Sequence, residues 1–308
     1  MNKPKIAVIG SLNMDIVIEA RRPPQMGETI MGEQAHFIPG GKGANQAVAS
    51  ARLGASTVMI GAVGQDAFGK QLLDSMQQEG IDCKTIKTVE QAATGIASIL
   101  LAQGDNSIIV IAGANGHCTP DDIDRHEQSI AAADVILLQL EIPLATVVYA
   151  AEKAKRLGKL VILNPAPAQR LPDTLYASID ILTPNETEVF QLAGCQDGEA
   201  ELQTAMQALQ HKGVGNVITT LGSKGAAFLD QETGQLVTLP AYKVPVVDTT
   251  GAGDSFNAGL AFALGSGKRI PEAVIFASRV AALAVTKMGA QQGMPTLDQV
   301  ENFMRKQG

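Results

Sequence analysis

Residues 135–163, VILLQLEIPLATVVYAAEKAKRLGKLVIL, contain the pattern that decides the fold. Two short apolar runs, at residues 135–138 and 160–163, flank an alanine-rich segment with helical character at residues 144–157. Strands that are apolar at every position are typical of parallel sheets covered on both faces, and parallel neighbours are usually joined through a helix. The stretch therefore predicts a strand–helix–strand unit.

The same alternation continues through most of the chain. Further apolar runs occupy residues 6–9, 57–60, 179–182 and 217–219, and helical patterns occupy residues 44–53, 69–78 and 200–211. Repeated alternation predicts an α/β fold with a doubly wound, mostly parallel sheet and helices on both faces. A length of 308 residues allows one large domain or two small ones, and we expect a single domain over residues 1–308.

Two stretches interrupt this alternation. Residues 16–37 and 95–111 contain shorter extended runs separated by turns rich in Gly, Pro and Asn, and the second stretch predicts a hairpin that turns at Gln103-Gly104-Asp105-Asn106. We expect these strands to be inserted into the α/β domain as a small β-sheet lid over a site.

Composition excludes several classes of protein. A formal charge of −7 provides no broad positive field, so nucleic acid is not an expected partner. Cys83, Cys118 and Cys195 are far apart, which predicts free thiols in a reducing compartment, and the four histidines have no zinc-ligand spacing. No apolar stretch reaches the ~20 residues of a membrane span, so we expect a cytoplasmic protein without a membrane partner.

Polar residues follow several of the predicted strands. They are Asn13, Glu141, Asn164 and Asn185. Ligands of open α/β sheets bind at the carboxyl ends of the strands, and this set would suit a ligand rich in hydroxyl groups. Ordinary loop polarity and helix capping explain each residue equally well when it is taken alone.

The segment VVDTTGAGDSF, residues 246–256, carries the strongest chemical signal. A Gly-Ala-Gly turn before an alanine-rich helix exposes backbone N–H groups at the positive end of the helix, which predicts a cradle for a phosphate. Asp254 follows the cradle directly, where a carboxylate would suit the removal of a proton from an attacking alcohol. The alternative is a plain glycine turn with Asp254 as a helix cap.

Three weaker motifs allow two interpretations each. In GGKGANQA, residues 40–47, the glycines would let a helix start pack close to a ligand, although Lys42 taken singly suits a solvated surface. In NETE, residues 185–188, Asn185 and Glu188 predict a capping box, or Glu188 holds water on a magnesium ion. The glycine turn of residues 219–225 suits the phosphates or ribose of a nucleotide, or is a simple turn.

Taken in their order along the chain, the motifs resemble those of the ribokinase-type carbohydrate kinase family. Residues 248–254 resemble its carboxyl-terminal signature and residues 40–47 its amino-terminal signature, with residues 164–167, 183–188 and 220–225 between them. The resemblance spans nearly the whole chain. It implies a ribokinase-like fold, ATP-dependent phosphorylation of the 5-hydroxyl of D-ribose, Mg²⁺ with ATP, activation by K⁺, and a homodimer formed through the lid strands. The alternatives are a family kinase for deoxyribose, fructose or a nucleoside, and a sugar-binding regulator without turnover.

The resemblance also implies roles for individual residues. Its catalytic group comprises the base Asp254 and an anion hole of the Gly251, Ala252 and Gly253 amides. Its sugar contacts are Asn13, Asp15, Gly41, Lys42, Gly43, Asn45, Glu141 and Asp254. Its nucleotide contacts are Asn185, Thr220, Leu221, Gly222, Ser223, Gly225, Gly253 and Ser278. Its monovalent cation ligands are Asp248, Thr250, Ala284, Lys287, Gly289 and Gly293, and Glu188 contacts magnesium through water.

Two positions depart from the family pattern. Gly293 replaces a serine that commonly serves as the last cation ligand, so a carbonyl or a water would serve there. Ser278 replaces a histidine or asparagine near the adenine, so contacts with the base would differ. Neither departure touches the predicted phosphoryl-transfer centre.

Overall fold

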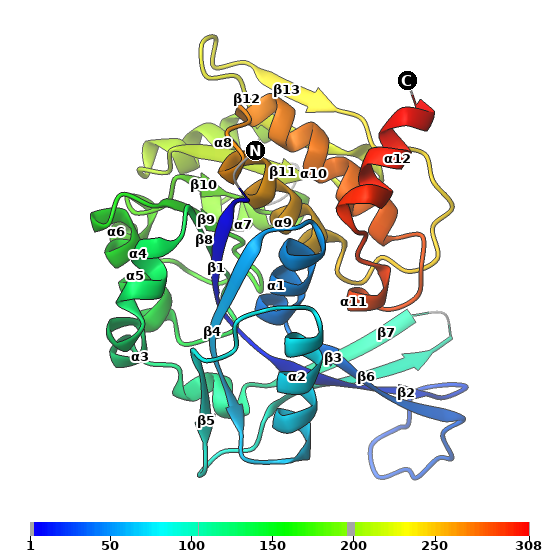
Figure 1. Ribbon diagram of the computed structural model, residues 1–308. Helices are drawn as coiled ribbons and strands as arrows, with labels where there is room; N and C mark the ends of the chain where they lie inside the picture. Colours follow the sequence, from blue (N-terminus) through cyan, green and yellow to red (C-terminus); the bar gives the residue numbers. More distant parts are fainter. Residues whose placement is uncertain (1–2, 104, 196–200, 308) are drawn as a thin grey trace.

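The computed structural model describes residues 3–103, 105–195 and 201–307 (Figure 1). The strands are β1 (Lys5–Ile9), β2 (Asn13–Glu19), β3 (Gln34–Gly40), β4 (Ser56–Gly64), β5 (Ile86–Val89), β6 (Gly95–Ala102), β7 (Asp105–Ile111), β8 (Val135–Leu138), β9 (Leu160–Leu163), β10 (Ile181–Leu182), β11 (Asn216–Thr220), β12 (Ala226–Leu229) and β13 (Leu236–Leu239). The α-helices are α1 (Lys42–Arg52), α2 (Ala67–Gln78), α3 (Pro120–Arg125), α4 (Glu127–Ala132), α5 (Leu144–Arg156), α6 (Asp173–Tyr176), α7 (Glu186–Ala193), α8 (Leu202–His211), α9 (Ala252–Gly265), α10 (Ile270–Ala284), α11 (Ala290–Gly293) and α12 (Leu297–Gln307), and two 3-10 turns are η1 (Gly113–His117) and η2 (Gly222–Lys224). Gly104 of the predicted hairpin turn and Ala200 of the predicted helix 200–211 lie outside the described residues.

The central sheet confirms the predicted fold class. Its strand order is β13-β12-β11-β10-β9-β8-β1-β4-β5, and every pairing from β11 to β5 is parallel. The strand–helix–strand unit of the opening stretch forms as predicted, with Val135 paired to Leu160 and α5 between the two strands.

The structure corrects several strand predictions. The run at residues 179–182 contributes only Ile181–Leu182 to the sheet. Strands β5, β12 and β13 were not predicted, and β12 and β13 pair antiparallel at one edge. Continuous apolar runs indicate strands that are covered on both faces. Strands β5 and β13 are partly exposed, so this pattern does not indicate them.

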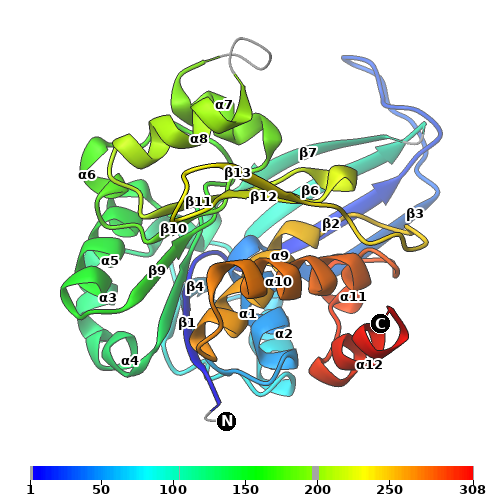
Figure 2. The ribbon, with the colours of Figure 1, turned by 90° about the horizontal axis from the view of Figure 1, so that it is seen from above.

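Helices cover both faces of this sheet, as Figures 1 and 2 show. Ile6 and Val8 of β1 point into an apolar core shared with α1, α2, α9 and α10, whereas Ala7 and Ile9 point into a second core shared with α5, α7 and α8. This two-residue alternation follows from the pleat of a strand. Among the described residues, no helix has the length and apolar character needed to cross a bilayer.

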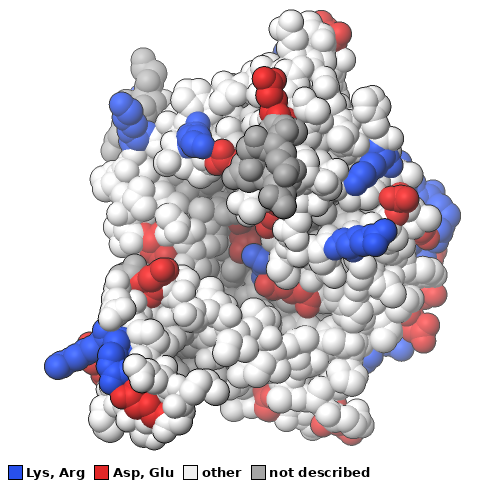
Figure 3. Space-filling view, turned by 180° about the vertical axis from the view of Figure 1, so that it is seen from behind, with Lys and Arg blue, Asp and Glu red and all other residues white. Residues whose placement is uncertain are grey.

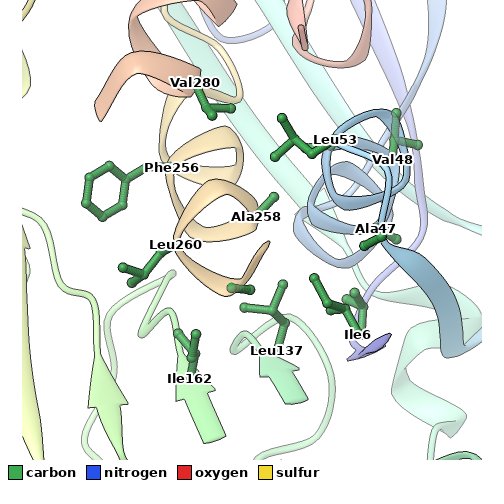
Figure 4. Packing of buried hydrophobic residues seen from close by; sticks show 14 of the residues in the cluster. Ile6, Ala47, Val48, Leu53, Leu137, Ile162, Phe256, Ala258, Leu260 and Val280 are labelled. Atoms are coloured by element: carbon green, nitrogen blue, oxygen red, sulfur yellow. The ribbon is translucent and has the colours of Figure 1, made fainter. Parts of the chain in front are cut away.

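Helix α9 is packed between α1 and α10, and it brings the predicted catalytic segment against the sheet. Figure 4 shows α9 and α1 side by side, with Ala258 of α9 on the side that faces α1 and Leu260 of α9 near Ile162 of β9. Small side chains on both helices permit this close approach, since a bulky residue at such positions would force the axes apart. The packing of α1 on α9 therefore sets the relative positions of polar residues at the first turns of the two helices.

The second sheet has the order β3-β2-β6-β7 and extends away from the main body (Figure 2). The β2–β3 and β6–β7 pairs are antiparallel and β2 pairs parallel with β6. Asn13 pairs with Gly95 where β2 and β6 leave the main body. Strand β2 begins before the predicted bound at residue 16, because the polar residues Asn13 and Asp15 are themselves part of it. Strand β3 continues beyond the predicted bound at residue 37.

Candidate active site

A cavity of about 150 Å³ lies where the first turn of α9 meets the carboxyl ends of the central strands. Figure 3 shows that the face opposite that of Figure 1 is hollowed and that acidic and basic side chains gather there. The residues lining the cavity are Lys42, Asn164, Ala166, Thr183, Asn185, Glu188, Thr220, Gly251, Gly253, Asp254 and Asn257. The cavity therefore combines residues from the predicted catalytic, sugar-binding and nucleotide-binding groups.

Asp254 is buried in the first turn of α9, with 6% of its surface exposed. Its Oδ2 accepts a hydrogen bond from Asn45 Nδ2 at 2.9 Å, and its Oδ1 accepts one from Gln46 Nε2 at 3.1 Å. The helix-cap alternative is wrong, because α9 has Gly251 at its N-cap and no side-chain cap. Burial raises the pKa of Asp254, while Lys42 and the two amide donors act in the opposite direction.

The amino-terminal end of α9 holds the three amides predicted as an anion cradle, and they differ in their hydrogen bonding. Gly251 adopts the left-handed conformation at φ 75°, which turns the chain into the helix. The Ala252 N–H already donates to the Thr249 carbonyl at 3.2 Å. The Gly253 N–H belongs to the first turn, where α-helical N–H groups have no carbonyl partner one turn back. Of the three predicted anion-hole amides, Ala252 is thus engaged within the turn, and Gly251 and Gly253 line the cavity.

Glu141 connects the amino-terminal end of α1 to the loop after β1. Its Oε2 accepts hydrogen bonds from Ser11 Oγ at 2.5 Å and from the Lys42 N–H at 3.0 Å. A Cβ added at Gly43 would lie 2.5 Å from the Ser11 nitrogen, so glycine is required for this contact between the two backbones. The glycines of residues 40–43 therefore allow close packing of protein on protein.

Asn13 is oriented by a residue that the sequence analysis did not identify. The Nδ2 of buried Asn115 donates to Asn13 Oδ1 at 2.8 Å and also to the Leu12 carbonyl. With its oxygen engaged, Asn13 keeps its NH₂ group as a donor. Gly41 packs directly against this turn, because an added Cβ there would lie 2.7 Å from the Asn13 nitrogen.

Asp15 and Lys42 belong to the charged part of the predicted sugar site, together with Glu141 and Asp254. Burial raises the pKa of Asp15 to about 7, with further contributions from Glu141 and Asp254, while Lys42 opposes them. The side chain of Lys42 is half-buried, and although burial lowers its pKa, the surrounding carboxylates outweigh burial and raise it. The Asp15 carboxyl lies against Gly40, where an added Cβ would be 2.2 Å from Oδ2.

The predicted nucleotide residues divide into two groups. Asn185, Thr220 and Gly253 line the cavity, and an isolated β-bridge places Asn185 beside Thr220. Asn185 also forms the capping box of α7 with Glu188, the predicted magnesium residue, which lines the cavity as well. Burial raises the pKa of Glu188, opposed by the Asn185 N–H and Lys42. The remaining residues lie outside the cavity wall: Leu221, Gly222, Ser223 and Gly225 in the turn at η2, and half-buried Ser278 on α10.

Asp248, a predicted cation ligand, connects the loop before α9 to the loop before α11. Asp248 Oδ1 accepts hydrogen bonds from the Thr250 N–H and Oγ1, and its Oδ2 accepts one from the Gly289 N–H at 2.8 Å. These hydrogen bonds hold the pKa of Asp248 below its ordinary value, although burial, the largest single effect, acts to raise it. A negative charge next to the turn before α9 suits a cation.

Gly293 packs against the carbonyl of Ala284. An added Cβ at Gly293 would lie 2.4 Å from that oxygen, so in this geometry the position has no room for a serine. Lys287, from the same region, has an exposed side chain. No group of three or more His, Cys, Asp or Glu side chains in the described ranges is arranged to hold a metal ion, so a cation here would depend on backbone carbonyls in addition to Asp248.

The polar surroundings of Asp254 include Asn164, which was predicted as a polar strand-end residue, and Gln46, Thr183 and Asn257, which were given no individual role from the sequence. Gln46 donates to Asp254, Asn164 accepts from Gln46, and Thr183 donates to Asn257 Oδ1 at 2.6 Å. Asn164 and Thr183 follow β9 and β10, so the polar residues at strand ends were a usable signal for them. Gln46 and Asn257 lie on buried helices and show no such pattern.

We expect Asp15→Asn to stabilise the chain at pH 8 and to leave its stability nearly unchanged at pH 4. Between the ordinary pKa of 3.8 and about 7, only the folded state retains the Asp15 proton, so the free energy of unfolding falls as the pH rises through this window. Urea denaturation midpoints of wild type and variant at the two pH values measure the effect. Equal gains at both values would contradict it.

Comparison with known proteins identifies the family. Residues 3–297 match the pfkB family carbohydrate kinases. The chain is 42% identical to a ribokinase of Haemophilus influenzae over 97% of this chain and 98% of that protein, and 38% identical to a deoxyribokinase of Salmonella typhi over 97% and 98%. The structure of an Arabidopsis thaliana ribokinase complexed with ribose and ATP matches with a TM-score of 0.90, 35% identity, and 99% coverage of both chains. The chain therefore belongs to the pfkB family of carbohydrate kinases.

Proposed function

We propose that this chain transfers the γ-phosphoryl group of ATP to the 5-hydroxyl of D-ribose, producing D-ribose 5-phosphate and ADP. The observation that carries the proposal is the buried Asp254 carboxylate, which faces the cavity at the amino-terminal end of α9. The similarity to a ribokinase with bound ribose and ATP supports this choice of substrates.

In the proposed reaction, Asp254 is the general base. The sugar hydroxyl transfers its proton to the Asp254 carboxylate as its oxygen attacks the γ-phosphorus, and the bond from phosphorus to the bridging oxygen of ADP breaks. A carboxylate whose pKa is raised by burial is a stronger base than an exposed one. The Gly251 and Gly253 amides, at the positive end of α9, would stabilise the negative charge on the transferred group.

The proposed sugar site uses the polar groups around Lys42. Asp15 accepts hydrogen bonds from two neighbouring hydroxyl groups, and the Asn13 NH₂ group donates to a third. Asn45 differs from this expectation, because its Nδ2 donates to Asp254 and its Oδ1 accepts from Gln291 Nε2 at 3.1 Å. We therefore assign Asn45 first to the support of Asp254 and only second to the sugar.

Different residues in and near the cavity suit the two proposed ions, Mg²⁺ and K⁺. Mg²⁺ usually takes one or two carboxylates together with phosphates and waters, and Glu188 in the cavity wall fits this role through water. When bound, Mg²⁺ would neutralise charge on the nucleotide phosphates. For K⁺, Asp248 would supply the charge and carbonyls of the loop that ends at Gly289 would supply further oxygen ligands, since the Gly289 N–H holds this loop against Asp248.

A second candidate function is phosphorylation of deoxyribose, which the similarity to the Salmonella typhi protein favours. Coupled ADP production with ribose, 2-deoxyribose, fructose and nucleosides as acceptors tests both functions. We expect the highest kcat/KM with ribose, because an acceptor that lacks a hydroxyl leaves a buried polar group without its partner. A higher value with deoxyribose would select the second candidate, and sugar binding without ADP release would indicate a regulator.

Asp254→Asn is expected to lower kcat at least ~100-fold, the loss typical of a positioned base, while sugar affinity changes only a few-fold. ADP production and calorimetric sugar binding measure the two effects. Asp121→Asn, at an exposed position of α3, is the matched control. Turnover close to wild type in Asp254→Asn would remove this residue from the mechanism.

Replacing K⁺ by Na⁺ is expected to lower activity, because the site proposed at Asp248 depends on carbonyl oxygens that suit the larger ion. Asp248→Asn is expected to weaken the dependence on K⁺, since it removes the only full negative charge that we assign to this site. Initial rates across a K⁺ titration at constant ionic strength measure both effects. Equal rates in Na⁺ and K⁺ buffers would contradict the proposal.

We further propose that the second sheet is a lid over the sugar site and that it joins two copies of the chain. Its edge strand β7 exposes a continuous apolar run, with Ile108, Ile109, Val110 and Ile111 each 51–67% exposed. An exposed apolar edge strand is a template for pairing with another chain. A second copy that packed on this surface would cover it.

Ile109→Lys is therefore expected to convert a dimer into a monomer, because it places a charge within the apolar run. Light scattering coupled to size-exclusion chromatography measures the mass. Met31→Lys, at an 89% exposed position between β2 and β3, is the control and should retain the wild-type mass. A wild-type chain that is monomeric at all concentrations would contradict the proposal.

A further inference from the structure

Gln46 differs from the other buried polar residues of α1 in that both hydrogens of its side-chain amide are donated at the Asp254 site while its oxygen is held from the opposite side. It is fully buried. Its Nε2 donates to Asp254 Oδ1 at 3.1 Å and to Asn164 Oδ1 at 3.3 Å, and its Oε1 accepts from Gln139 Nε2 at 2.7 Å. Both amide hydrogens and the oxygen are thus engaged, which leaves Gln46 no group to offer a substrate.

The direction of this hydrogen-bond chain follows from the chemistry of its end. An ionised carboxylate only accepts hydrogen bonds, so Gln46 must turn its NH₂ group toward Asp254. Its oxygen then faces Gln139, which must donate. Gln139 Oε1 lies against Gly10, where an added Cβ would be only 1.9 Å away, and this oxygen has no hydrogen-bond partner among the described residues. Gln139 therefore turns its NH₂ group toward Gln46 because Gln46 Oε1 needs a donor, and its own oxygen remains without a partner among the described residues.

We infer that Gln46 is a positioning residue for Asp254 and that Gln139 acts through it by fixing the direction of the Gln46 amide. This inference rests on the proposed function. Buried amides cost free energy relative to an apolar side chain of similar size, so packing alone does not explain two glutamines at these positions. The arrangement keeps one donor on Asp254 Oδ1 and leaves the carboxylate oriented toward the cavity.

Charged groups also face Asp254 from the surrounding elements. They are Lys42 on α1, Glu141 after β8 and Asp15 on β2. Lys42 favours the ionised form of Asp254, and the two carboxylates disfavour it. Loss of the Gln46 donor would add to the effect of the carboxylates and make Asp254 harder to ionise.

Gln46→Met tests the inference, because methionine fills similar space without a donor. We expect kcat to fall about tenfold or more, the change expected for loss of one hydrogen bond to an ionised group, with KM for ribose within about threefold of wild type. The acid limb of the pH profile of kcat should move to higher pH, since the base must then ionise without its donor. Gln71→Met, at an exposed position of α2, is the matched control.

Gln139→Met tests the link between the two glutamines. It should shift the acid limb of the pH profile of kcat in the same direction by a smaller amount. In the double variant it should lower kcat less than about twofold below that of Gln46→Met alone, because the effects of residues that act through one another are not additive. Independent, multiplicative effects would overturn the role of Gln139. If Gln46→Met does not fold, the pH profile of Gln139→Met decides the inference.

A second measurement separates this inference from the proposed function. Infrared difference spectra against Asp254→Asn isolate the Asp254 carboxyl band, whose titration midpoint does not require turnover. We expect the midpoint to rise in Gln46→Met. An unchanged midpoint with an unchanged pH profile would overturn the inference, whereas a wild-type chain that makes no ADP with any sugar would overturn only the proposed function.

Discussion

The structure depends on the burial of one carboxylate at the junction of two helices. Asp254 lies in the first turn of α9, and Asn45 and Gln46 on α1 donate to its two oxygens. A buried charge is tolerated only where donors and opposite charge replace water. The packing of α1 on α9, which Figure 4 shows, is therefore an electrostatic requirement of the site as well as a contribution to the core.

The polar residues that line the cavity come together around this junction. Strands of the parallel sheet end at the same edge, so Asn164 and Thr183 come beside Asp254 although they are far from it in sequence. Lys42 lies in the same cavity wall as Asp254 and Glu188, which places a positive charge between the proposed sugar and nucleotide regions. A positive charge at this position suits the proposed transfer of an anionic phosphoryl group from the nucleotide to the sugar.

The acidic character of the proposed sugar site has a consequence for stability. Asp15, Glu141 and Asp254 act together on the same region, and burial raises the pKa of Asp15 to about 7. A group of this kind reduces folding stability at the pH at which it is ionised. The chain therefore retains at its proposed binding site a carboxylate that folding alone would not favour.

The sequence by itself determined the parallel sheet and the position of the catalytic segment, because both depend on local patterns. Continuous apolar runs indicate strands that are covered on two faces, and the residues before Asp254 predict a phosphate cradle wherever the helix is placed. Only the tertiary structure decided which residues support that carboxylate. Gln46, Gln139 and Asn115 are buried amides whose roles come from partners up to 208 positions away, and no local pattern encodes such contacts. The structure likewise decided that Gly293 packs on the Ala284 carbonyl, since that contact exists only after α10 and α11 have packed together.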